Sequence, residues 1–163
     1  MRRFAPALLI VATLSLCGIV AALAGPRSVD TASSVSIDLD VPTRAVAREP
    51  ARLTLTIENH GQTAIDDVGM KINPGYAKVM TVIETRPLAR IDDAPNERRI
   101  YFGRLGAGEK ASYAVVVAPR SAGDFALTAR VVAARRGFEP IVLTDSRSGR
   151  AEFTATTTVL PPR

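Results

Sequence analysis

The stretch Leu53-Thr54-Leu55-Thr56-Ile57-Glu58-Asn59-His60-Gly61 decides the fold class of this chain. Leu53, Leu55 and Ile57 alternate with polar residues, and successive side chains of a β-strand point to opposite faces. The stretch therefore predicts a strand with one face buried against a core. Asn59 and Gly61 are residue types that tolerate turn conformations, so the strand is expected to end there.

The same alternation recurs along most of the chain, and no stretch after Ala24 shows a sustained helical period. Turn residues separate the segments, as at Asn73-Pro74-Gly75 and Gly106-Ala107-Gly108. Many short strands with frequent turns predict an all-β, antiparallel β-sandwich of seven to eight strands. The other predicted strands are 35–40, 68–72, 78–85, 99–102, 112–117, 125–132 and 152–159, and the bulky core members are expected to be Phe102, Phe125, Phe153 and Tyr113.

Residues 134–149 are polar at both ends and are predicted to connect the last two strands as an exposed loop. The apolar centre of this loop, Ile141-Val142-Leu143, has the composition of a short additional strand. We accordingly predict one sandwich domain over residues 34–160, with a short tail at 161–163.

Residues 1–24 have the pattern of an export signal. Arg2 and Arg3 precede an uncharged apolar run, and Ala22-Leu23-Ala24 places small residues before a cleavage point. An N-terminal hydrophobic leader helix is therefore expected, followed by a linker over 25–33. The leader acts as a cleaved signal peptide or, since about 20 apolar residues can span a bilayer, as an anchor. Lipidation at Cys17 is a third alternative, disfavoured by the bulky Leu16 before it.

Each of these alternatives places the domain on the outer side of the cytoplasmic membrane, because the N-terminal arginines stay inside. The predicted location is therefore extracytoplasmic: periplasmic, secreted or anchored facing outward. The single cysteine of the chain lies in the leader, so the domain has no disulfide framework and no thiolate chemistry. The net charge of +5 is modest, and export argues against nucleic acid as a partner.

The order of motifs resembles bacterial immunoglobulin-like modules of the CARDB, DUF11 and NEW3 types. The motifs are the strand ending in Asn59-His60-Gly61, the turn Leu105-Gly106-Ala107-Gly108-Glu109, and Gly123-Asp124-Phe125 before a late strand. The resemblance covers roughly residues 34–159 and implies an immunoglobulin-like fold with Leu105 plugging one end. Members of these families are mostly non-catalytic modules, which implies a structural or binding role.

Catalytic and metal-binding chemistry finds little support in the sequence. His60 is the only histidine, is expected to lie exposed in a turn, and has no serine in a nucleophile-elbow context to serve. One histidine without a cysteine in the domain cannot form a zinc site. The acidic pairs Asp66-Asp67 and Asp92-Asp93 are interpreted as solvated turn residues. No catalytic residue, metal site or cofactor is therefore predicted.

A cluster of arginines over residues 86–104 is the first of two predicted contact regions. It either presents a basic face to an anionic partner or, as we favour, is paired with Asp92, Asp93 and Glu97. The loop at 134–149 is the second predicted contact region. The predicted partner-binding residues of the two regions are Arg98, Arg99, Tyr101, Arg104, Arg135, Arg136 and Phe138.

The sequence thus predicts a non-catalytic extracytoplasmic module that binds or scaffolds another envelope protein or a surface polymer. Contact with the membrane is expected only through an uncleaved leader, and the oligomeric state is not predicted. The alternative is a small secreted hydrolase with an unrecognised carboxylate site, which a pocket joining two acids would favour. Binding at an exposed sheet edge by strand addition is one mechanism open to the module.

Overall fold

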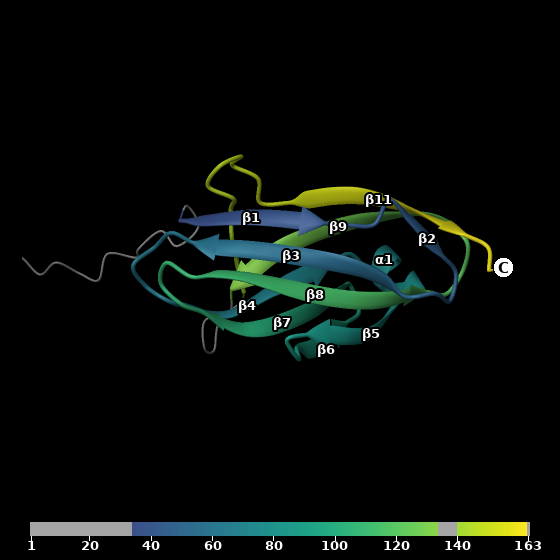
Figure 1. Ribbon diagram of the computed structural model, residues 1–163, viewed down its shortest axis with the longest axis horizontal. Coiled ribbons are helices and arrows are strands. Elements are labelled where there is room, and N and C mark those ends of the chain that lie inside the picture. The colour runs from purple at the N-terminus through teal and green to yellow at the C-terminus, as the bar shows by residue number, and fades with distance from the viewer. Residues whose placement is uncertain (1–33, 134–139, 163) are drawn as a thin grey trace, which may run out of the picture.

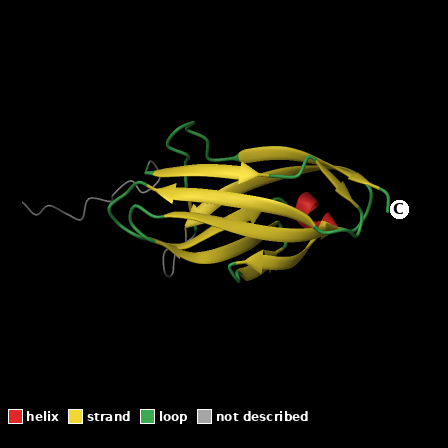
Figure 2. Ribbon diagram, in the orientation of Figure 1, coloured by secondary structure: helices red, strands yellow, loops and turns green. Residues whose placement is uncertain are grey.

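The computed structural model describes residues 34–133 and 140–162 as two β-sheets packed face to face, with one short helix at the end of the sandwich (Figures 1 and 2). The leader, the linker and residues 134–139 lie outside the described residues. The elements are β1 Val35–Asp40, β2 Arg44–Val46, β3 Ala51–Asn59, β4 Ile65–Ile72, α1 Pro74–Val79, β5 Met80–Arg86, β6 Arg90–Ala94, β7 Glu97–Leu105, β8 Lys110–Pro119, β9 Gly123–Ala133, β10 Ile141–Val142 and β11 Phe153–Leu160.

One sheet has the strand order β1-β3-β8-β5, and the other has the order β2-β11-β9-β4-β7-β6, with β10 added beside β9. All strand pairings are antiparallel except β2 with β11, which is parallel. The predicted β-sandwich is confirmed, and each of the eight predicted strands is present. The sequence analysis missed β2 and β6 because neither has an alternating apolar pattern.

The core lies between the sheets and follows the predicted alternation. Leu53, Leu55 and Ile57 of β3 are each at most 1% exposed, while the residues between them are only partly buried. Phe102 of β7 stacks on Tyr113 of β8 with ring centroids 4.5 Å apart, which joins the two sheets through the core. Such a pair contributes about 0.5–1.5 kcal/mol beyond the burial of its apolar area. Leu105 is fully buried, as the resemblance implied, and Phe125 and Phe153 pack against the core while partly exposed.

The segment after β4 corrects the expectation that the domain contains no helix. Pro74 opens α1 at its first turn, where its fixed φ suits a helix and its missing N–H is not needed. Tyr76 is buried, and its hydroxyl lies 3.2 Å from Thr157 Oγ1 of β11. Six residues are too few to display a helical period, so burial of Tyr76 in the tertiary structure decides this element.

The segment between β9 and β11 corrects a second expectation. The predicted short strand forms as β10, but the described residues that follow it are not an exposed loop throughout. Leu143 and Asp145 are both buried. This part of the chain folds back against β1, where residue Asp145 forms a bridge with Val35.

Candidate functional site

The four predicted contact residues that the structure describes all lie on β7 but face in different directions. Arg98 points toward α1 and β5, donating from Nη1 to the carbonyl oxygens of Ala77 and Met80 at 3.2 and 3.1 Å. Its guanidinium also forms a two-bond ion pair with Asp93 of β6, and the Arg98 hydrogen bond lowers the pKa of Asp93. Arg98 therefore ties the two sheets together at the β5–β6 side.

Arg99 and Tyr101 lie on the outer face of the same sheet. Arg99 pairs with Glu97, which also accepts from Lys71 Nζ at 2.6 Å. Tyr101 is buried because the guanidinium of Arg90 covers its ring, with the guanidinium carbon atom 4.5 Å from the ring centroid. Gly69 is the cross-strand neighbour of Tyr101, and a Cβ there would approach the Tyr101 ring to 2.7 Å.

Arg104 is apart from these residues, largely exposed and 3.7 Å from an oxygen of Asp66. The predicted pairing of the arginines with Asp92, Asp93 and Glu97 is confirmed by the ion pairs that each acid forms. The remaining predicted contact residues, Arg135, Arg136 and Phe138, lie outside the described residues. Binding of a partner at any of the seven stays a prediction.

The strongest surface feature of the described residues is the side of the sandwich where β5 and β6 form the edges of the two sheets. A three-residue turn, 87–89, joins these strands, so both edges lie on the same side (Figure 1). Three of the four exposed large apolar side chains among the described residues lie in this short stretch of chain. They are Ile83 (53% exposed), Leu88 (92%) and Ile91 (40%).

The structure treats its edge strands in different ways. β2 and β10 have three and two residues, which is too short to template another strand. β5 is interrupted by a bulge between Val82 and Glu84, which leaves Ile83 outside the regular pairing with β8. β6 pairs with β7 through all five of its residues without a bulge, and each of the five is exposed.

Backbone hydrogen bonds alternate across an antiparallel ladder, so every second residue of β6 points its N–H and C=O away from β7. Among the described residues, no hydrogen bond to these outward groups comes from another segment. The amino-acid pattern carried little sign of this edge, because Arg90–Ala94 holds one large apolar residue and two acids. We call β6, Arg90–Ala94, the open edge.

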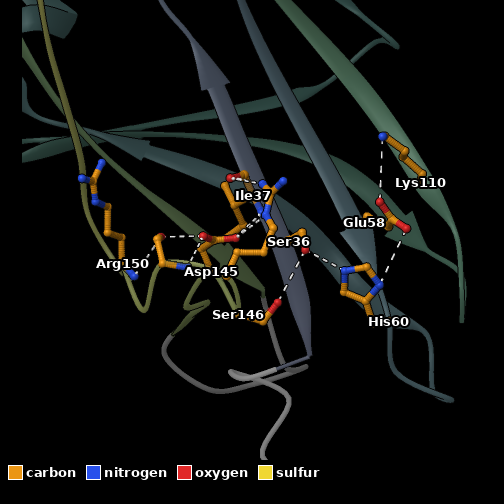
Figure 3. Close-up of polar contacts among 10 residues, drawn as sticks. Ser36, Ile37, Glu58, His60, Lys110, Asp145, Ser146 and Arg150 are labelled. Carbon is orange, nitrogen blue, oxygen red and sulfur yellow. Dashed lines mark hydrogen bonds and ion pairs between the residues drawn. The ribbon is translucent and has the colours of Figure 1, made fainter.

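The edge strand β1, which belongs to the other sheet, is partly covered by the segment that follows β10 (Figure 3). Ser146 donates its backbone N–H to the Val35 carbonyl at 2.7 Å, and an Asp145 carboxylate oxygen accepts the Ile37 N–H at 2.8 Å. Arg147 donates to the Ile37 carbonyl at 3.1 Å. Three outward backbone groups in the first half of β1, those of Val35 and Ile37, are thereby satisfied, which hinders pairing of another chain at this part of the edge.

Asp145 holds this covering segment in place. Besides the Ile37 N–H, its carboxylate accepts the backbone N–H and the hydroxyl of Ser148. Burial by itself raises the pKa of Asp145, but the hydrogen bonds of Ser148 and Ile37 and the charge of Arg147 outweigh it and lower the pKa to about 2. The sequence analysis did not single out Asp145, because its partner Ile37 lies far away in the chain.

A Ser–His–Glu arrangement lies beside the covering segment (Figure 3). Ser36 Oγ is 2.6 Å from Nε2 of His60, and Nδ1 of His60 is 3.7 Å from an oxygen of Glu58. The order of groups is that of a nucleophilic triad, but 3.7 Å is longer than a hydrogen bond and Ser36 is only 6% exposed. His60 itself is exposed at the end of β3, as predicted, and the arrangement fits a structural tie between β1 and β3.

The carboxylate alternative can be tested at a surface hollow that includes Glu97 and Glu152. Burial raises the pKa of Glu97, but hydrogen bonds from Lys71 and Arg99 overcome this and keep the pKa below its usual value. Glu152 is paired with Arg130 at 2.7 Å. A general acid of a glycosidase needs a raised pKa, so Glu97 does not suit that role.

The described residues offer neither a metal cluster nor a membrane-spanning helix. Within residues 34–133 and 140–162, no group of three or more potential ligands could hold a metal ion. No helix of these ranges is long and apolar enough to cross a membrane.

Comparison with known proteins identifies the type of fold. No family model matches the chain, and no curated protein matches it. A cohesin module from a Clostridium perfringens family 33 glycoside hydrolase superposes with a TM-score of 0.57 at 12% identity, over 79% of this chain and 98% of that one. The fold is immunoglobulin-like. This confirms the predicted resemblance to bacterial immunoglobulin-like modules at the level of the fold.

Two further solved structures have lower TM-scores. The CARDB domain of a Pyrococcus furiosus protein has a TM-score of 0.48 at 12% identity, over 78% of this chain and 94% of that one. A cohesin from a cohesin–dockerin complex of Clostridium thermocellum has 0.49 at 7% identity, over 78% and 99%.

Proposed function

We propose that this chain is a non-catalytic binding module outside the cytoplasmic membrane, which joins envelope components by accepting an extended strand at β6. The observation that carries the proposal is the contrast between two edge strands. In β1, the outward groups of Val35 and Ile37 are satisfied by three hydrogen bonds, whereas β6 is regular, exposed and uncovered within the described residues. Backbone hydrogen bonds to such an edge give affinity, and alternate side chains give specificity.

Apolar side chains beside the open edge support the same function. Ile91 lies opposite Ile100, a fully buried core residue, so Ile91 is on the core face of the sheet at its margin. A strand added to β6 would cover Ile91 and extend the core by one strand. Exposed apolar side chains gathered at one margin of a domain are typical of an interaction site. Another envelope protein therefore suits the site better than a surface polymer, which offers no strand.

Replacing Ile91 with lysine is expected to remove binding at the open edge, because an inward-pointing charge on an edge strand prevents strand addition. The full chain, Ile91→Lys and Leu160→Lys serve as baits for envelope extract, with captured proteins compared quantitatively. Leu160 is a matched control, since it is 47% exposed, gains the same charge and lies at the end of β11. Proteins captured by the full chain and by Leu160→Lys, but lost at least roughly tenfold with Ile91→Lys, support the proposal. Equal capture by both variants contradicts it.

The location is tested on the native protein by cell fractionation and N-terminal sequencing. A mature chain that begins at Gly25 in the periplasmic or secreted fraction supports export with cleavage of the leader. An intact N-terminus in the membrane fraction supports an outward-facing anchor. Recovery of the intact chain from the cytosol contradicts the proposed location.

A further inference from the structure

We infer that the strand received by the open edge is β6 of a second copy of this chain, so that the module forms a two-fold dimer through a continuous sheet. The inference rests on the proposed function and names its partner. It follows from which face of the sheet each β6 side chain occupies and from the order of charges along the strand.

The faces of β6 are fixed by contacts with β7. Arg90 lies over the ring of Tyr101 on the outer face, and Asp92 is on that face too, 3.4 Å from Arg90 Nε. Ile91 and Asp93 are on the core face, opposite Ile100 and Arg98 respectively. Along β6 the outer face therefore carries a cation followed by an anion, and the core face carries Ile91 followed by Asp93.

Directly opposite residues of an antiparallel pair have their side chains on the same face. Two copies of β6 can therefore meet only in registers that place outer residues opposite outer residues. Centring the pair on Asp92 would set Asp92 against its own copy, and centring it on Arg90 would set two guanidinium groups together. Both registers place like charges opposite each other, which destabilises a sheet.

The register centred on Ile91 instead places opposite charges against each other. It sets Arg90 of each copy against Asp92 of the other, giving two ion pairs, and sets Ile91 against Ile91 on the core face. Asp93 then lies beside Ala89 of the second copy, outside the regular ladder because the Ala89 N–H donates to Thr85 Oγ1 of its own chain, and keeps its own ion pair with Arg98. Leu88 follows directly outside the paired segment, where its 92% exposed side chain can cover the joint.

Self-complementarity of this kind distinguishes a second copy from an unrelated strand. An isologous interface needs a surface that matches itself under a two-fold axis. The residues of β6 meet that condition, in charge and in apolar contact, in the register centred on Ile91. The inferred occupant of the open edge is therefore a second copy of the chain, which is itself an envelope protein under the proposed function.

The experiment uses the full chain in mild detergent, with the dimer measured by sedimentation equilibrium. Arg90→Asp and Asp92→Arg, each alone, are expected to weaken the dimer roughly ten- to thirtyfold, because two attractive cross-strand pairs become repulsive. An equimolar mixture of the two variants is expected to recover dimer, since the aspartate introduced in one copy then faces the arginine introduced in the other. The double variant is expected to recover it as well.

Recovery in the mixture separates pairing between copies from a structural effect, because mixing cannot repair the pair within each chain. Asp66→Arg and Lys110→Asp are the matched controls, at two loosely paired and largely exposed charges outside β6. They should leave the dimer unchanged. A monomeric full chain, or single variants that weaken the dimer without recovery on mixing, overturns the inference. If the chain is monomeric while Ile91→Lys still abolishes capture of a different protein, the proposed function stands and only the self-pairing falls.

Discussion

Replacing Asn59 with alanine is expected to lower the free energy of unfolding by about 3 kcal/mol, the sum of several orphaned buried groups. Asn59 is 1% exposed at the end of β3. Its Nδ2 donates to the carbonyl oxygens of Thr63 and Gly106, both at 2.8 Å, and its Oδ1 accepts the Gly61 N–H at 3.0 Å. Truncation to alanine leaves all three backbone groups without their hydrogen-bond partner. The Asn59 amide therefore holds together the turn after β3 and the turn after β7, which lie at the same end of the sandwich.

Guanidinium unfolding of the full chain at neutral pH measures this loss. Asn96→Ala, in the exposed turn between β6 and β7, is the control and should change stability by less than about 0.5 kcal/mol. Asn59→Asp tests the donors alone, because it keeps an acceptor but turns a carboxylate toward two carbonyl oxygens. It should destabilise at least as much as Asn59→Ala. A loss below about 1 kcal/mol for both variants would show that these hydrogen bonds do not hold the turns.

Replacing Asp145 with alanine is expected to cost about 2 kcal/mol at neutral pH, because the lowered pKa of this carboxylate is a direct contribution to folding. The pKa falls from 3.8 to about 2 on folding, so the stabilisation is complete above the unfolded value. It is lost as the pH falls from about 4 toward 2. The side chain is 4% exposed, so water screens it weakly. The stability difference between the two proteins should therefore shrink below about pH 4.

Urea unfolding of the full chain and Asp145→Ala between about pH 2 and pH 7 measures this dependence. Asp66→Ala, with a side chain that is 73% exposed, is the control and should show no such change. Loss of Asp145 should also release the cover over β1 and expose a second edge, visible as faster amide exchange at Ile37. A stability difference that stays constant over this whole pH range would contradict the assigned role of the carboxylate.

Much of the architecture was predictable from the sequence because it depends on local alternation. The strands carrying Leu53, Tyr113 and Leu127 show a period of two, and each strand buries the face to which that residue belongs. The helix containing Tyr76 and the strand β6 were missed, because their positions depend on what they pack against. The predicted paired arginines were found, since acids stood close to them in the sequence.

The candidate site was less predictable. Arg98, Arg99 and Tyr101 were singled out, but the feature that distinguishes this region is the uncovered backbone of β6 beside Ile91. Whether a strand lies at an edge is a property of sheet order, and sheet order depends on contacts between residues remote in the chain. Asp145 was missed for the same reason, because its acceptor role exists only after β1 arrives beside it.

The sequence by itself determined that the domain is a sandwich without cysteine, since alternation and composition act within each strand. Only the tertiary structure decided which edges are sealed and which is open. Sealing β1 takes Asp145 and Arg147 brought across the fold, whereas β6 receives no such cover from the described residues. The physical reason is that an edge strand is one that lacks a neighbouring strand on one side. Which strands become neighbours depends on contacts between segments remote in the chain, so the sequence of one strand cannot show whether it lies at an edge.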